Sequence, residues 1–203
     1  MDFPVFADRK EYSVNELQKR IIAEGRVLPG DIIKVDGFMN HRVDVKLMRS
    51  LAKDISAHFA GHEITQVKTV EASGIPMATI TADELGVPLV FAKKAKSDNI
   101  EGGLICSEIH SYTYNKKVTL MVSAEWLSPD DKILIVDDFM ANGEAMRGLV
   151  DIISKVGAEL VGVAIAIEKG FQGGGDRLRA RGIDVYSLAI IEHAEPGNIV
   201  FRE

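Results

Sequence analysis

Residues 133–145 of the chain read ILIVDDFMANGEA. A run of four apolar residues ends in two carboxylates, Asp137 and Asp138, and small residues then lead into a helical pattern near Gly143. Open α/β sheets bind their ligands beyond the carboxyl ends of the strands, which is where this pattern places both carboxylates. The backbone N–H groups of the turn and the partial positive charge of a helix N-terminus favour a phosphate beside them.

The two carboxylates limit which ligands this pattern suits. Carboxylates are a poor match for a phosphate alone, but they accept hydrogen bonds from hydroxyl groups and bind metal ions. The sequence contains neither GxxxxGK[ST] nor GxGxxG between a strand and a helix, so a nucleoside triphosphate or a dinucleotide is a weaker match. A strand ending in two Asp residues is also common in other α/β proteins, including receiver-like domains, and it is the small-residue turn that favours a ribose phosphate ligand.

The pattern around this motif predicts the fold class. The runs at 133–136 and 161–167 are almost wholly apolar, as expected for parallel strands that helices cover on both faces. Helical spacing over 144–156 joins them in a strand–helix–strand unit. We therefore expect an α/β fold, with a mainly parallel twisted sheet flanked by helices. Strands are predicted at 66–70, 88–91, 132–136, 160–167 and 184–190, and helices at 44–60, 144–156 and 176–181.

A further helix is predicted near the N-terminus. Ser13 and Glu16 have the spacing of a capping box, Leu17 and Ile21 follow at helical spacing, and Gly25 offers a stop.

Two segments interrupt the alternation of strands and helices. Residues 94–126 combine lysines and a Gly-Gly pair with two β-prone stretches, at 104–114 and 117–123, which predicts a flexible loop followed by a hairpin. The glycine run at 173–175 lacks a phosphate-binding context and is interpreted as a flexible turn.

Composition excludes several functional classes. The 203 residues carry 24 Lys and Arg against 30 Asp and Glu, a formal charge of −6, so we expect no nucleic-acid partner. No window approaches the roughly 18 apolar residues of a membrane span, so no membrane partner is expected. Cys106 is the only cysteine, which excludes an intrachain disulfide and a zinc ribbon and favours a cytoplasmic location.

Three blocks of sequence carry a family resemblance. They read KVDGFMNH at 34–41, VDDFMANGEA at 136–145 and IEKGF at 167–171. Together they resemble the type I phosphoribosyltransferases, and within them the bacterial xanthine-specific members, over about residues 17–201. The resemblance implies transfer of the 5-phosphoribosyl group from phosphoribosyl pyrophosphate (PRPP) to N9 of xanthine, which gives xanthosine 5′-monophosphate and pyrophosphate in purine salvage.

The resemblance also assigns a PRPP site. Asp137 and Asp138 are the candidate catalytic residues and hold the ribose hydroxyls, while the turn after them holds the 5′-phosphate. The strand-to-helix turn at 71–76 meets the pyrophosphate, with an ordinary turn as the alternative. Lys93, Lys94 and Lys96 are candidates to add positive charge at the pyrophosphate, with Lys93 named as the binding residue, and a solvated charge run explains any single one of them equally well. The other candidate PRPP-binding residues are Ala72, Ser73, Gly74, Ala141, Asn142, Gly143, Glu144 and Ala145.

A base site follows from the remaining blocks. Lys169 ends an apolar strand, where a lysine is costly unless paired or solvated, so it is a candidate site residue or the partner of a nearby acid. The resemblance implies that Lys169 contacts a purine oxo group, with Phe171 as a stacking surface. It places Ile33 and Asn40 in a hood over the base, where an amide offers both a donor and an acceptor to a dioxopurine. By residue type alone, Asn40 is more often a turn or capping residue.

The resemblance sets expectations for the whole chain. Residues 13–203 form a single phosphoribosyltransferase domain after an extension of residues 1–12, and 26–42 with the C-terminal segment form the hood. Mg²⁺ is expected with PRPP, without a set of protein ligands, and a homodimer is expected. Two alternatives stay open: a PRPP-sensing regulator without catalysis, and a phosphoribosyltransferase for hypoxanthine or guanine, adenine or orotate.

Overall fold

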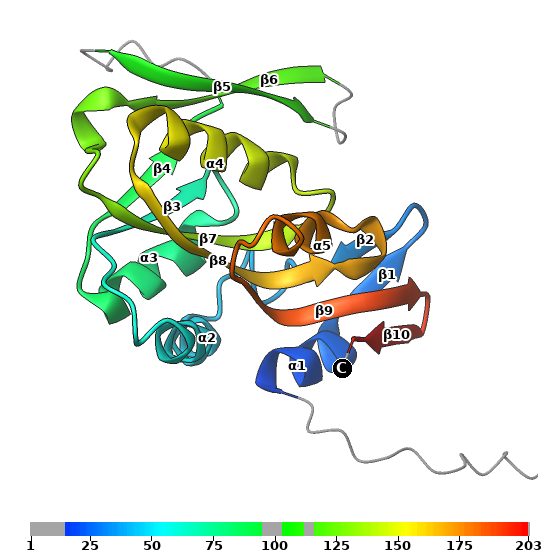
Figure 1. Cartoon of the computed structure of the whole chain (residues 1–203). Coiled ribbons are helices and arrows are strands. Elements are labelled where there is room, and N and C mark those ends of the chain that lie inside the picture. Colours follow the sequence, from blue (N-terminus) through cyan, green and yellow to red (C-terminus); the bar gives the residue numbers. More distant parts are fainter. Residues whose placement is uncertain (1–14, 95–102, 112–115, 203) are drawn as a thin grey trace, which may run out of the picture.

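A six-stranded sheet forms the centre of the structure (Figure 1). The computed structural model describes residues 15–94, 103–111 and 116–202. The strand order is β10-β9-β8-β7-β3-β4, and neighbours are parallel except for β10 with β9. The predicted α/β fold with a mainly parallel sheet is confirmed. The strands are β3 (Gln66–Val70), β4 (Leu89–Ala92), β7 (Lys132–Met140), β8 (Glu159–Lys169), β9 (Val185–Glu195) and β10 (Asn198–Phe201).

The strand that carries the two carboxylates is longer than the sequence predicts. The apolar run predicts a strand over 132–136, but β7 continues to Met140 and contains Asp137 and Asp138. The cause is strand pairing, because β8 also runs past its predicted end and pairs with β7 as far as Glu168. The two carboxylates therefore belong to a hydrogen-bonded strand and are held by its ladder.

Helices cover both faces of the sheet, as predicted. The helices α2 and α3 lie on one face, and α4 lies on the other, where the hairpin of β5 and β6 covers it in turn (Figure 1). In β7, Leu134 and Val136 enter the core beneath α2 and α3, whereas Ile133 and Ile135 enter the core beneath α4. The bounds are α2 (Val45–His58), α3 (Ile75–Leu85), α4 (Glu144–Val156), β5 (Leu104–Ser111) and β6 (Lys116–Ser123). No helix among the described residues has both the length and the apolar composition that crossing a membrane requires.

The predicted capping box of Ser13 and Glu16 is wrong. Helix α1 (Glu16–Glu24) is capped by Asn15, whose side chain accepts from the backbone N–H of Gln18, while the Gln18 side chain accepts from the N–H of Asn15. The Asn15 side chain also donates to the carbonyl of Leu188 in β9. This tertiary contact adds to the capping box, whose Asn15–Gln18 spacing is as local a signal as the Ser13–Glu16 spacing. The predicted extension at 1–12 and Ser13 itself lie outside the described residues.

Two short strands and a short helix lie near the ends of β8 and β9. The strands β1 (Arg26–Leu28) and β2 (Ile32–Lys34) pair antiparallel within the segment expected to form the hood. After β8 come η2 (Gly170–Gln172) and α5 (Gly174–Arg179). Another short helix, η1 (Ala124–Trp126), follows β6.

The interpretation of residues 173–175 as a flexible turn is wrong. Gly174 and Gly175 form the buried first turn of α5. A Cβ at Gly174 would lie 2.2 Å from the carbonyl oxygen of Ala141, and one at Gly175 would lie 2.1 Å from a carboxylate oxygen of Glu168. The glycines therefore permit α5 to pack directly on its neighbours, because any side chain would collide there.

A buried lysine lies in β3, between β7 and the edge strand β4. Lys68 of β3 is 0% exposed, and its Nζ donates to the side-chain oxygen of Gln66 at 2.5 Å. Burial lowers the pKa of Lys68 from 10.5 to about 8, because leaving water disfavours the charged ammonium.

We expect this lysine to make stability depend on pH. Between pH 8 and 10.5 the unfolded chain keeps the Lys68 proton and the folded chain has lost it, so the free energy of unfolding rises with pH. Relative to Lys68→Met, the wild-type chain should gain about 2 to 3 kcal/mol across this range. Denaturant unfolding of both proteins at several pH values measures the difference, and parallel pH profiles would contradict the expectation.

Candidate active site

Asp137 and Asp138 lie near the carboxyl end of β7, with exposed fractions of only 6% and 3%. Successive side chains of a strand point to opposite faces, so Asp138 shares the face of Val136, toward the core beneath α2 and α3. Because β3, β7 and β8 are parallel, their carboxyl ends meet at this edge of the sheet. The fold thus brings the turns after all three strands together around the acid pair.

Asp138 joins two of the predicted binding segments. The Asn40 side-chain amide donates to one of its carboxylate oxygens at 3.1 Å, and the Ser73 hydroxyl donates to the other at 2.9 Å. Asn40 and Ser73, which lie 98 and 65 positions before Asp138 in the sequence, are thereby held within one hydrogen-bonded group. In this structure Asn40 contacts the acid pair, which differs from the base contact expected for it.

Asp137 is packed against the turn that follows β3. A Cβ at Gly74 would lie 2.0 Å from a carboxylate oxygen of Asp137 and 2.4 Å from the hydroxyl of Thr69. Burial raises the pKa of Asp137 well above its usual value, and the neighbouring charge of Asp138 raises it further. Ionising both carboxylates of the pair therefore costs free energy, and a bound cation or hydroxyl donors would reduce that cost.

The Thr69 hydroxyl adjoins this pair and is a feature that sequence reasoning missed. Its Oγ1 is buried and has no hydrogen-bond partner among the described residues. Its position at the end of β3, directly before the turn at 71–74, is the only signal that the sequence offers for it.

The turn after β7 presents backbone N–H groups. Gly143 caps α4 with a positive φ of 78°, which glycine adopts without strain. Within the described residues, none of the N–H groups of 142–145 donates to another protein group. The Glu144 side chain is turned away, since it pairs with Arg147 at 3.0 Å and accepts from the backbone N–H of His110. The backbone N–H groups of this turn are therefore free to bind an anion, and the Glu144 carboxylate does not compete with it.

Two lysines follow β4 near the acid pair. Lys93 is held by its backbone, which exchanges two hydrogen bonds of 2.9 Å with Met121 of β6. The N–H of Lys94 donates to the Glu71 side chain at 2.5 Å, and the charge of Lys94 opposes the rise in the pKa of Asp137. The positive charge of Lys94 thus acts on Asp137, and the assignment of Lys93 to the pyrophosphate stays a prediction. The predicted contribution of Lys96 falls outside the described residues.

Apart from Asn40, the predicted base-binding residues lie near the end of β8 and in the β1–β2 hairpin. The Lys169 Nζ donates to the backbone carbonyl of Asp31, at 2.8 Å, and burial lowers the pKa of Lys169. Phe171 is 38% exposed, whereas Ile33 is 7% exposed and packs in the core. The structure therefore joins Lys169 to the hairpin through the backbone carbonyl of Asp31, whose carboxylate charge opposes the fall in the pKa of Lys169.

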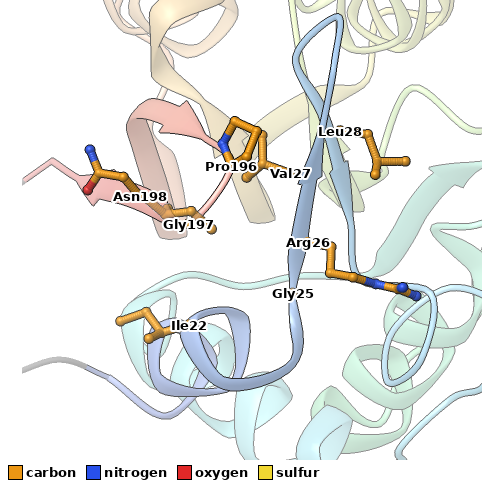
Figure 2. Close-up of a pocket in the computed structure, with 9 residues that line it drawn as sticks. Ile22, Gly25, Arg26, Val27, Leu28, Pro196, Gly197 and Asn198 are labelled. Atoms are coloured by element: carbon orange, nitrogen blue, oxygen red, sulfur yellow. The ribbon is translucent and has the colours of Figure 1, made fainter.

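A surface pocket of about 390 Å³ lies away from these groups. It is formed by the end of α1 and β1 on one side and the turn between β9 and β10 on the other (Figure 2). None of the predicted site residues lines it. Its lining residues are Ile22, Gly25, Arg26, Val27, Leu28, Pro196, Gly197, Asn198 and Ile199.

Comparison with known protein families identifies the family to which this chain belongs. The phosphoribosyl transferase domain family matches residues 38–191, which include the acid pair, the turn after β7 and Lys169. This chain belongs to the phosphoribosyltransferase family. The predicted family is thereby confirmed.

Relatives with high sequence identity are named xanthine phosphoribosyltransferase. One from Bifidobacterium longum (strain NCC 2705) is 48% identical over 93% of this chain and 100% of its own length. Another from Streptococcus pneumoniae serotype 2 is 44% identical over 92% of this chain and 97% of its own length.

Solved structures support the type I phosphoribosyltransferase fold. Adenine phosphoribosyltransferase from Trypanosoma brucei superposes with a TM-score of 0.71 at 21% identity, covering 85% of this chain and 78% of that one. The enzyme from Giardia lamblia gives 0.66 at 24% identity, covering 74% of this chain and 82% of that one. At these identities the likeness concerns the fold alone.

Proposed function

We propose that this phosphoribosyltransferase acts on xanthine: it transfers the 5-phosphoribosyl group of PRPP to N9 of xanthine and forms xanthosine 5′-monophosphate and pyrophosphate in purine salvage. The observation that carries the proposal is the buried acid pair, Asp137 and Asp138, directly before a turn whose N–H groups at 142–145 are not bonded to other described residues. Relatives at 44% and 48% identity bear the name of this activity.

In this proposal the acid pair holds the ribose of PRPP. Carboxylates accept hydrogen bonds from the ribose hydroxyls, and the backbone N–H groups of the turn hold the 5′-phosphate. The turn at 72–74 meets the pyrophosphate, and the Ser73 bond to Asp138 couples that turn to the acid pair. Lys93 and Lys94 add positive charge on the side of the leaving group.

The chemistry requires orientation more than proton transfer. N9 attacks C1′ from the face opposite the pyrophosphate, so the anomeric centre inverts as the C–O bond breaks. Positive charge develops on the sugar in the transition state, and the negative acid pair beneath the ribose stabilises it. Burial and mutual repulsion disfavour a second negative charge on the pair, and the developing cation relieves that cost.

The acid pair is also compatible with Mg²⁺ carried by PRPP. Among the residues that the structure describes, no three His, Cys, Asp or Glu side chains are grouped to hold a metal ion. A Mg²⁺ ion prefers substrate oxygens and water to an all-protein site, and its charge would offset that of Asp137 and Asp138. When bound with PRPP, the ion supplies charge neutralisation to the pyrophosphate.

The base is proposed to lie between the end of β8 and the β1–β2 hairpin. Lys169 is half-buried, and its Nζ donates to the neutral backbone carbonyl of Asp31, at 2.8 Å, in the β1–β2 hairpin. A purine oxo group is the kind of acceptor that this ammonium suits. Phe171 offers a stacking surface, and Ile33 and Asn40 belong to the hood side of the base.

The wider organisation is part of the proposal. Residues 13–203 form a single catalytic domain, with 26–42 and the C-terminal segment as its hood. The protein works as a homodimer in the cytoplasm.

Product formation from PRPP and Mg²⁺ tests the function. Xanthine, guanine, hypoxanthine, adenine and orotate are supplied separately, and the nucleotides are separated by chromatography. Preferential xanthosine 5′-monophosphate is the expected result. Formation of a different nucleotide would support phosphoribosyl transfer but contradict xanthine as the base. Saturable PRPP binding without turnover would indicate a PRPP sensor.

Replacement of Lys169 tests the base site. We expect Lys169→Met to raise KM for xanthine about tenfold to a hundredfold, the usual effect of losing a hydrogen bond from a charged donor, and to leave KM for PRPP near the wild-type value. Steady-state kinetics with each substrate varied in turn measure both constants. Lys53→Met, at an exposed position of α2, is the matched control. Equal xanthine constants in the two variants would remove Lys169 from the base site.

A further inference from the structure

The first turn of α5 lies directly against the turn at 141–143. A Cβ at Gly174 would lie 2.2 Å from the carbonyl oxygen of Ala141 and 2.8 Å from the backbone nitrogen of Gly143. From the other side, a Cβ at Gly143 would lie 3.4 Å from the Cα of Gly174. The two backbones therefore touch without any side chain between them. Both segments lie at the carboxyl end of the sheet, past β7 and β8 (Figure 1).

Arg177 adds a directed contact to this packing. Its guanidinium donates to the backbone carbonyl of Asn142 at 2.9 Å and to that of Gln172 at 3.2 Å. A peptide group is planar, and in the trans form its N–H points opposite to its C=O. By holding the carbonyl of Asn142, Arg177 restrains the plane of the 142–143 peptide and directs the N–H of Gly143 away from the guanidinium.

The helix that carries Arg177 is itself firmly attached. Arg179 donates to both carboxylate oxygens of the fully buried Glu168, at 3.0 and 2.7 Å. On the other side of Arg177, Asp176 pairs with Arg202 near the C-terminus, at 2.6 Å. Arg177 therefore extends from an anchored helix, and its contact with Asn142 restrains the turn relative to the sheet.

We infer that Arg177 is a positioning residue for the phosphate-binding turn and acts through the Asn142 carbonyl, with Gly174 as the contact that makes the approach possible. The inference rests on the proposed function, because it assigns the 5′-phosphate of PRPP to the N–H groups of 142–145. Arg177 does not contact the substrate in this scheme. It holds the 142–143 peptide in the orientation that an anion requires before the anion arrives, which lowers the cost of binding.

Substrate-resolved kinetics test this role. Arg177→Ala should raise KM for PRPP about tenfold, while KM for xanthine at saturating PRPP and kcat stay within about twofold of wild type. Arg177→Lys keeps one charged donor and should recover part of the PRPP affinity. Arg181→Ala, an exposed arginine just beyond α5, is the matched control and should leave KM for PRPP unchanged. Identical PRPP constants for Arg177→Ala and Arg181→Ala would overturn the inference, as would a parallel loss of kcat and of both substrate affinities.

Gly174→Ala provides a second test, because it changes the packing between α5 and the 141–143 turn. The added Cβ meets backbone atoms, so the turn must shift. Calorimetric titration with PRPP should then show at least tenfold weaker binding, whereas Gly61→Ala, where a Cβ meets open space, should bind as wild type. Unchanged PRPP binding by a folded Gly174→Ala variant would overturn the inference. Wild-type protein that neither binds PRPP nor forms a nucleotide would instead reject the proposed function, so the two failures are distinguishable.

Discussion

Asp138→Ala is expected to lower kcat/KM for PRPP by a factor of about 10² to 10³, the usual loss when a preorganised group that stabilises transition-state charge is removed. Asp138 is 3% exposed and holds Asn40 and Ser73 through its two oxygens. The substitution removes the charge beneath the ribose and also releases both partners. Steady-state kinetics with PRPP as the varied substrate measure the loss.

Two comparisons separate this catalytic effect from a general loss of structure. Asp138→Asn keeps the shape and one acceptor oxygen, so it should fold like wild type yet lose most of the activity because the charge is gone. Asp130→Ala changes an exposed acid in the loop before β7 and should keep full activity. Wild-type kcat/KM in a folded Asp138→Asn variant would exclude the proposed role of the charge.

Glu168→Gln is expected to lower the free energy of unfolding by about 3 kcal/mol, near the lower end of the usual cost of breaking a buried ion pair. Glu168 is 0% exposed and accepts from Arg179 and from the Ser187 hydroxyl. The neutral amide leaves Arg179 without its buried partner. The effect stays near the lower end because the Arg179 side chain is 29% exposed and keeps its pair with Asp176.

A surface pair serves as the control for this substitution. Glu63 pairs with Lys132 at 2.6 Å, but the Glu63 side chain is 71% exposed. Ion pairs in water contribute little, so Glu63→Gln should leave the denaturation midpoint almost unchanged. Urea unfolding of both variants gives the comparison. Equal midpoints for Glu168→Gln and Glu63→Gln would show that burial does not strengthen the Glu168 pair.

The sequence by itself determined the fold class, most strands of the central sheet, the helix after the acid pair and the family of this protein. Apolar runs that helices must cover on both sides predict the parallel strands, because only a doubly covered sheet buries every residue of a run such as 133–136. The helix at 144–156 was predicted with its observed bounds, because its spacing and terminal glycine are local features. The Asp-Asp pair and the turn after it are contiguous, so their chemistry could also be read from residue types alone.

Tertiary structure decided the contacts between distant segments. The bond from Asn40 to Asp138 joins residues 98 positions apart, and the bond from Lys169 to the Asp31 carbonyl joins residues 138 apart. Neither residue type carries a signal for such a partner. The same reason explains the error at Gly174, which is buried because the 141–143 turn lies against it. The capping error was local, since Asn15 and Gln18 also have capping-box spacing. Local sequence specifies local geometry, whereas the partner of a polar group or the neighbour of a glycine depends on which segments the fold brings together.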